Sequence, residues 1–126
     1  MMARRILVVD DEERLRELVQ ACLEDLAGWE TRVAASGTEC LQLAQSEGID
    51  AIVLDVSMPE MNGFEVYEQL QANPVTQAIP VIFLTAKVLP TDRDRFARLG
   101  VAGVITKPIE PLTLTEEIAE VLGWAL

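Results

Sequence analysis

Four short stretches of the chain place apolar residues at consecutive positions, which strongly limits how the chain can fold. These stretches are Ile6–Val9, Ala51–Leu54, Pro80–Leu84 and Ala102–Thr106. A strand that alternates apolar and polar residues can leave one face in water, whereas a strand that is apolar throughout has to be covered on both faces. Such strands, separated by helical segments, are typical of a doubly wound parallel α/β sheet.

Helical patterns lie between these strands. Apolar residues recur at steps of three and four from Leu15 to Leu26, and Gly28 is expected to end that helix. A further strand is expected at Trp29–Ala34, and the other helices are expected over 37–48, 64–72, 91–99 and 111–122. The chain is therefore predicted to form one domain, residues 1–126, with five strands and five helices and no output domain. Proteins of this flavodoxin-like class have the strand order 2-1-3-4-5, which we adopt from the class rather than derive from these residues.

Charge and composition exclude several functions. The net charge of −11 would repel phosphate backbones, so direct nucleic-acid binding is not expected. No apolar run approaches the roughly 20 residues that a membrane span needs, and no signal peptide is visible, so a cytoplasmic protein without membrane insertion is expected. Cys22 and Cys40 lie far apart in helical patterns and are interpreted as buried, reduced thiols.

Polar residues follow the apolar strands at the points where they end. Asp10 and Asp11 follow the first strand, Asp55 the third, Thr85 the fourth and Lys107 the fifth. Ligands bind at the carboxyl edge of parallel sheets, so these side chains are predicted to form one site. Each has an ordinary alternative role, such as helix capping for the Asp pair or a solvated charge for the lysine. The coincidence of all of them at strand ends favours the site.

Clustered carboxylates require a cation. The chain contains no histidine, and hard oxygen ligands favour Mg²⁺ over zinc. Phosphoryl transfer depends mainly on positioning and on neutralising the oxygens of the transferred group. Asp55 is the predicted nucleophile, Asp10 and Asp11 are better suited to hold the ion, and Thr85 and Lys107 can contact phosphoryl oxygens.

The chain resembles the receiver domains of two-component response regulators over essentially its whole length. The matching motifs are Ile6–Glu12, Leu54-Asp55 with Met58–Gly63, Leu84–Ala86 and Thr106–Pro108. The resemblance implies that Asp55 accepts a phosphoryl group from a phosphohistidine on a sensor histidine kinase or histidine phosphotransfer protein. It also implies that Asp10, Asp11, Asp55 and the Ser57 carbonyl arrange Mg²⁺, and that the Lys107-Pro108 peptide is cis.

The resemblance also indicates how a signal would leave the site. Thr85 is expected to turn toward the phosphoryl group and to shift the Ala86–Pro90 loop. An aromatic residue on the fifth strand normally follows, but this chain has Val104, which has one stiff torsion and no ring. Ser57 and Lys87 are expected to influence the phosphoryl lifetime. The kinase or phosphotransfer partner is expected to contact residues of the first helix and the last strand-to-helix loop, namely Arg14, Leu15, Leu18, Pro108 and Ile109.

Other functions fit less well. A degenerate receiver that only binds proteins would have lost an acidic or lysine position, and none is lost here. A haloacid-dehalogenase-type hydrolase needs a second aspartate two residues after the nucleophile, where this chain has Ser57. We therefore predict not an enzyme with a separate substrate but a phosphoacceptor that catalyses its own phosphorylation and dephosphorylation. It would act on a downstream protein as a monomer or as a weak, phosphorylation-dependent dimer. The apolar end, Trp124–Leu126, is expected to pack on the domain.

Overall fold

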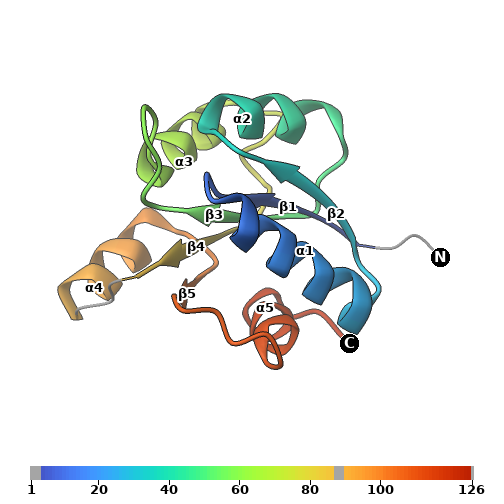
Figure 1. Ribbon diagram of the computed structural model, residues 1–126. Coiled ribbons are helices and arrows are strands. Elements are labelled where there is room, and N and C mark those ends of the chain that lie inside the picture. The colour runs from blue at the N-terminus through green and yellow to red at the C-terminus, as the bar shows by residue number, and fades with distance from the viewer. Residues whose placement is uncertain (1–3, 87–89, 126) are drawn as a thin grey trace.

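Five parallel strands form the centre of the molecule, and the computed structural model describes residues 4–86 and 90–125. The strands are β1 (Arg5–Val9), β2 (Glu30–Ala34), β3 (Ala51–Asp55), β4 (Val81–Thr85) and β5 (Gly103–Thr106). They pair side by side in the order β2-β1-β3-β4-β5 (Figure 1). The predicted doubly wound sheet and its strand order are confirmed.

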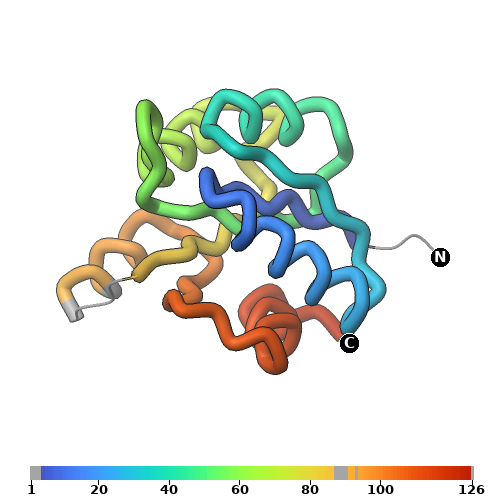
Figure 2. Tube along the Cα trace, viewed as in Figure 1, coloured from blue at the N-terminus to red at the C-terminus, as the bar shows by residue number. Residues whose placement is uncertain are grey.

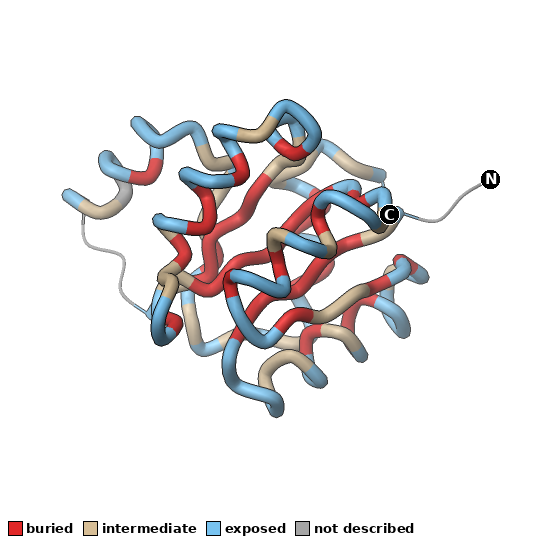
Figure 3. The backbone as a smooth tube through the Cα atoms, turned by 90° about the horizontal axis from the view of Figure 1, so that it is seen from above, coloured by how far each residue is buried: buried red, intermediate tan, exposed pale blue. Residues whose placement is uncertain are grey.

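Helices cover both faces of this sheet. They are α1 (Glu13–Ala27), α2 (Gly37–Ser46), α3 (Gly63–Ala72), α4 (Pro90–Leu99) and α5 (Leu114–Leu122). Figure 2 shows α5, in red, beside the blue α1, although the two helices are far apart in the sequence. In Figure 3 the buried positions follow the strands, and the exposed positions follow the outer sides of the helices. Within the described residues, no helix has both the length and the apolar character needed to span a membrane.

Two hydrophobic layers result from the alternation of side chains along the strands. On β4, Phe83 belongs to the layer beneath α2, α3 and α4, whereas Leu84 belongs to the layer beneath α1 and α5. Cys22 and Cys40 are buried without a disulfide, as predicted, and burial raises the pKa of the Cys40 thiol to about 12. Burial, and then the charge of Asp25, also raises the pKa of the Cys22 thiol above 9.0, so neither thiol ionises near neutral pH.

The helix ends agree with most of the sequence signals. Gly28 ends α1 in the left-handed conformation, with φ of 69°, and its amide donates to the carbonyls of the preceding turn. Asn62 and Glu65 form a reciprocal capping box at the start of α3. The predicted start of the last helix is wrong by three residues, because residues 111–113 form a turn and α5 begins at Leu114. The amides of Thr113 and Leu114 both donate to the Glu110 carbonyl, which closes that turn.

The end of the described chain packs against its beginning. The Trp124 ring meets the buried Trp29 ring edge to face, with centroids 5.3 Å apart, and the Arg4 guanidinium lies 4.5 Å from the Trp124 centroid. The expected packing is confirmed for Trp124, whereas Leu126 lies outside the described residues.

We expect Trp124→Ala to lower the free energy of unfolding by about 2 kcal/mol, because it removes a ring that is partly buried against another aromatic residue. Leu112→Ala is the matched control, since Leu112 is 78% exposed, and it should cost less than about 0.5 kcal/mol. Urea denaturation followed by circular dichroism measures both. Equal losses would show that Trp124 contributes nothing specific.

Candidate functional site

The carboxyl edge of the sheet brings three carboxylates together. Asp10 follows β1 directly, Asp11 comes next, and Asp55 is the last residue of β3, which pairs with β1. Carboxylate oxygens of the three residues all lie within 4.8 Å of one another. Asp10 and Asp55 are almost completely buried, at 1% and 2% exposure, whereas Asp11 is exposed. The predicted acidic cluster is therefore present, and it opens to solvent on the Asp11 side.

Lys107 supplies the cation expected from the fifth strand. Its Nζ lies 3.2 Å from Asp10 Oδ2 and 3.2 Å from Asp55 Oδ1. The contact with Asp55 is a hydrogen bond, whereas Asp10 Oδ2 lies within ion-pair distance but accepts no well-directed hydrogen bond. The Lys107-Pro108 peptide is cis, as the resemblance implied. One ammonium faces three carboxylates, so the described residues leave two formal negative charges in the cluster uncompensated.

The pKa of the Asp55 carboxyl is raised above 3.8, first by burial and then by the charge of Asp10. Lys107 and the Ser57 amide, which donates to Asp55 Oδ1 at 3.3 Å, act in the opposite direction. As the pH rises above 3.8, the unfolded chain therefore loses this proton before the folded chain does. Ionisation of Asp55 thus lowers the stability of the fold, and the full penalty is reached above the raised pKa.

The pKa of Lys107 is shifted by opposing effects. Burial alone would lower it, but the charges of Asp10 and Asp55 and their contacts with the ammonium outweigh burial, and the net direction is upward from 10.5. The stabilisation from this lysine is consequently complete below pH 10.5 and is lost only as the pH rises through the raised value. At neutral pH the ammonium is charged and compensates part of the carboxylate cluster.

The donor set fits a hard divalent cation. Two carboxylates at 4.8 Å repel by about 3 kcal/mol at an effective dielectric constant of 20, and the cluster contains three of them. Asp10 Oδ2 is buried and faces the Lys107 ammonium at 3.2 Å but accepts no well-directed hydrogen bond, so this oxygen is available as a ligand for a further cation. Two uncompensated charges and oxygen-only ligands match Mg²⁺.

Backbone contacts place the remaining predicted residues around this cluster. Thr85 ends β4 beside β5, and its carbonyl accepts from the Lys107 amide at 2.8 Å. Ser57 is exposed and contacts Asp55 through its amide. Ala86 is exposed just after β4, and Val104 is partly buried on β5 against the layer of α2, α3 and α4. Lys87 and the middle of the predicted 86–90 loop lie outside the described residues.

The predicted docking residues follow the carboxyl ends of β1 and β5 along the chain. Leu15 and Ile109 are partly buried against the layer of α1 and α5. Leu18 is 39% exposed, and Arg14 and Pro108 are also exposed. Arg14, Leu18 and Pro108 are therefore accessible, whereas Leu15 and Ile109 serve partly as core.

Arg16 is a site residue that the sequence analysis missed. Its Nη1 donates to the Asp10 carbonyl at 2.7 Å, while Asp10 Oδ1 accepts from the Glu12 amide at 2.8 Å. Glu12, at the start of α1, provides no side-chain cap. The turn from β1 into α1 is thus held by contacts to Asp10 rather than by a helix cap. Nothing in the sequence distinguishes Arg16 from the nearby Arg14, so the sequence contained no signal for this contact.

Gly63 is a second missed residue. It is the first residue of α3, and its amide donates to the Val56 carbonyl at 3.0 Å. A Cβ at this position would lie 2.6 Å from the Asp55 carbonyl oxygen and 2.8 Å from the Val56 Cα. The Asn-Gly pair indicated a turn but could not reveal that α3 begins in contact with the backbone of Asp55.

The comparisons with known proteins agree with this geometry. Residues 6–119 match the family model described as the response regulator receiver domain. The chain belongs to the receiver-domain family of response regulators. PilH of Pseudomonas aeruginosa is 37% identical over 119 residues, which cover 94% of this chain and 98% of PilH. The chain spans only about half the length of some other curated relatives.

Solved receiver structures have the same fold. The chemotaxis protein CheY4 of Vibrio cholerae is 33% identical, with a TM-score of 0.88, over 95% of this chain and 99% of that one. The receiver domain of the sensor histidine kinase PA1611 from Pseudomonas aeruginosa is 25% identical, with a TM-score of 0.83, over 97% and 99% of the two chains. That structure is described as having a magnesium ion coordinated in its active-site cleft.

We expect Lys107→Met to lower the stability of the metal-free protein by about 1–3 kcal/mol at pH 7, because it leaves buried carboxylates without their ammonium. The variant should also gain more stability from added MgCl₂ than the wild type does, since a cation then replaces the missing charge. Thermal melts in EDTA and in MgCl₂ measure both effects. Arg98→Met, which removes an exposed arginine on α4, is the control. A smaller Mg²⁺ response in Lys107→Met than in the wild type would contradict this account.

We expect Gly63→Ala to cost about 1–3 kcal/mol of stability, because the new methyl group meets backbone atoms of β3 that cannot move aside. Gly37→Ala is a close control. Gly37 also begins a helix, but its Cβ would meet side-chain atoms of Val66 and Met61 rather than backbone atoms. Urea denaturation should therefore show the larger loss for Gly63→Ala, and the reverse order would refute the role of this close contact.

Proposed function

We propose that this chain is the phosphoacceptor of a two-component or phosphorelay signalling system and that Asp55 carries the phosphoryl group. The observation that carries the proposal is the cluster itself: three carboxylates within 4.8 Å, with one ammonium 3.2 Å from two of them. Membership in the receiver family supports the same assignment. A degenerate receiver, used only to bind proteins, would not need the complete charge set.

Asp55 is the acceptor because its contacts direct its side chain and leave one of its two oxygens without a hydrogen bond from the described residues. Its Oδ1 accepts from the Ser57 amide and from Lys107, which fixes the carboxylate plane. Among the described residues, no hydrogen bond is made to Asp55 Oδ2, so this oxygen is free to attack phosphorus. Asp10 is unsuited to this role because its Oδ1 is held by the Glu12 amide and its Oδ2 is deeply buried.

The chemical step exchanges one bond to phosphorus for another. The Asp55 oxygen forms a P–O bond as the P–N bond of the donor phosphohistidine breaks, and the imidazole leaves with the electron pair of the broken bond. Lys107 already contacts Asp55, so its ammonium lies within reach of a phosphoryl oxygen on that residue. Thr85, at the end of the neighbouring strand, donates to another such oxygen. Hydrolysis of the acyl phosphate by water later restores the carboxylate.

Asp10, Asp11, Asp55 and the Ser57 carbonyl would hold Mg²⁺ at this site. When bound, the ion neutralises negative charge on the carboxylates and the phosphoryl oxygens. The protein contributes the preformed ligand set: Arg16 and the Glu12 amide fix the backbone and side chain of Asp10, and Gly63 lets α3 approach Asp55.

The partners follow from this chemistry. The donor is a sensor histidine kinase or a histidine phosphotransfer protein, which docks over Arg14, Leu18 and Pro108 with Leu15 and Ile109 beneath. Arg14 lies three residues after Asp11 and Pro108 directly follows Lys107, so a partner docked there is close to the acidic cluster along the chain. The modified protein then binds a downstream protein target. We place these events in the cytoplasm.

We expect acetyl phosphate with MgCl₂ to add one phosphoryl group to the wild-type protein, as measured by intact mass, and EDTA to prevent the reaction. Asp55→Asn should show no adduct. This variant should melt at a higher temperature than the wild type in EDTA at pH 7, because it removes the ionised carboxyl whose pKa the fold raises. A missing adduct in Asp55→Asn therefore cannot be attributed to unfolding.

The other outcomes separate the alternatives. Steady turnover of unrelated phosphate esters would indicate a hydrolase. A wild-type protein that is folded, binds Mg²⁺ and still takes up no phosphoryl group would indicate a degenerate receiver. An adduct that persists in Asp55→Asn would show that the acceptor is a different residue.

A further inference from the structure

All phenylalanines and the single tyrosine of this chain meet in one place. The chain has three phenylalanines and one tyrosine. Phe64 and Tyr67 come from α3, Phe83 from β4 and Phe96 from α4, and we call these four residues the aromatic cluster. Phe83 meets each of the other three rings edge to face, with centroids 5.3 to 5.7 Å apart. Phe64 also stacks on Phe96, with centroids 5.8 Å apart.

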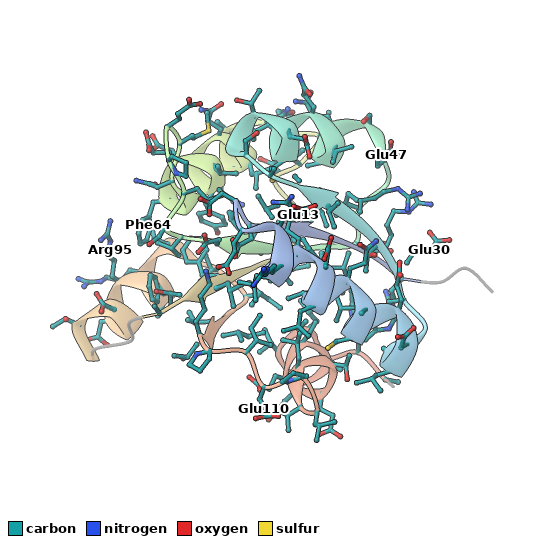
Figure 4. The ribbon with its side chains drawn as sticks, in the orientation of Figure 1. Glu13, Glu30, Glu47, Phe64, Arg95 and Glu110 are labelled. Carbon is teal, nitrogen blue, oxygen red and sulfur yellow. The ribbon has the colours of Figure 1, made fainter. Side chains whose placement is uncertain are left out.

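Two polar contacts tie the outer parts of α3 and α4 together over this cluster. The Arg95 guanidinium lies 4.0 Å from the centroid of the Phe64 ring, and Figure 4 shows these two labelled side chains between α3 and α4. The Tyr67 hydroxyl donates to the Leu99 carbonyl at 3.1 Å. Leu99 is the last residue of α4, where carbonyls lack partners within the helix. The middle and the end of α4 are therefore both fixed to α3.

The aromatic cluster is also close to the acidic site along the chain. Phe83 lies two residues before Thr85, and side chains two apart on a strand share one face of the sheet. Phe64 follows Gly63, whose Cα packs against the backbone of Asp55. A shift of either the end of β4 or the start of α3 thus reaches the cluster within two residues.

The fifth strand contributes no ring to this arrangement. Val104 pairs with Phe83 in the sheet and packs partly buried against the same hydrophobic layer. A valine has a single stiff torsion and cannot swing between an inward and an outward position as a ring can. Ring contacts to α4 come only from β4 and α3 within the described residues.

We propose that the aromatic cluster, rather than β5, transmits phosphorylation of Asp55 to α4 in this protein. The proposal rests on the proposed function, because it needs an acyl phosphate at Asp55. Formation of the acyl phosphate moves the ends of β3 and β4, Phe83 and Phe64 shift against Phe96, and α4 moves relative to α3. Tightly packed rings pass between discrete arrangements rather than deforming continuously, so a small shift at the site becomes a rearrangement of the helix.

Fluorine labels test this transmission directly, because Phe and Tyr occur only in the aromatic cluster and Trp occurs only in the other hydrophobic layer. Fluorophenylalanine places a label at three positions, all in the cluster, and fluorotyrosine places one at Tyr67, against the end of α4. Fluorotryptophan labels Trp29 and Trp124, which pack together in the layer on the other face of the sheet. The tryptophan signals therefore serve as an internal control for the rest of the domain.

We expect acetyl phosphate with MgCl₂ to shift the Phe and Tyr ¹⁹F signals and to leave both Trp signals in place, with the adduct confirmed by intact mass on the same samples. Phe96→Leu should still take up the phosphoryl group, but the shift of the Tyr67 signal should fall to less than about half. Arg95→Gln changes an exposed side chain, so it should fold normally, and it should reduce the same shift. Arg98→Gln, an exposed arginine on the same helix, should not.

Val104→Ala tests whether the signal reaches α4 through the aromatic cluster or through β5. If the cluster carries the signal, this variant keeps the wild-type response of the Tyr67 label. An adduct that forms without any shift of the Phe and Tyr signals would overturn the inference and leave the proposed function intact. A response lost in Val104→Ala but retained in Phe96→Leu would also overturn it. Absence of the adduct in the wild type would overturn both.

Discussion

Electrostatic repulsion among carboxylates at one edge of the sheet is the constraint on which the rest of this structure depends. A buried carboxylate is costly, and Asp10 and Asp55 are both buried beside each other. The fold tolerates them because Lys107 lies 3.2 Å from each and backbone amides donate to both. These contacts do not fully offset the cost of burying the Asp55 charge next to Asp10, and the pKa of Asp55 is therefore raised. A site of this kind gains stability when it binds cations or donors.

The parallel sheet is what makes such a site possible. The strands deliver their last residues to one edge, where ligands bind in parallel sheets. Most of the support is backbone: the Val56 amide donates to the Leu84 carbonyl, and the Lys107 amide donates to that of Thr85. These bonds continue the strand pairing for one residue beyond the sheet. The functional side chains are consequently carried by the ends of the central strands, where Asp10 and Asp55 are almost completely buried.

The parts of this architecture that the sequence predicted are those that depend on the order of neighbouring residues along the chain. Consecutive apolar residues in β1 and β3 indicated buried parallel strands, and polar residues at the strand ends indicated the site. Arg16 and Gly63 could not be identified in the same way, because their roles depend on contacts with the Asp10 and Asp55 backbone that only the folded chain creates. The start of α5 was misplaced because Pro111 is well suited to a helix start. The turn closed on Glu110 instead delays the helix.

The aromatic cluster could not be predicted from the sequence either. Each of its members is an ordinary core residue when considered alone, and only the packing of α3, β4 and α4 brings them together. In this chain β5 carries Val104 and not a ring, so one means of coupling is missing. The valine does not isolate α4 from the acidic site, because Phe83 lies two residues before Thr85 and Phe64 directly follows Gly63. On the proposed route, the connection between the acidic site and α4 is made by the packed rings of α3, β4 and α4, and β5 supplies none of them within the described residues.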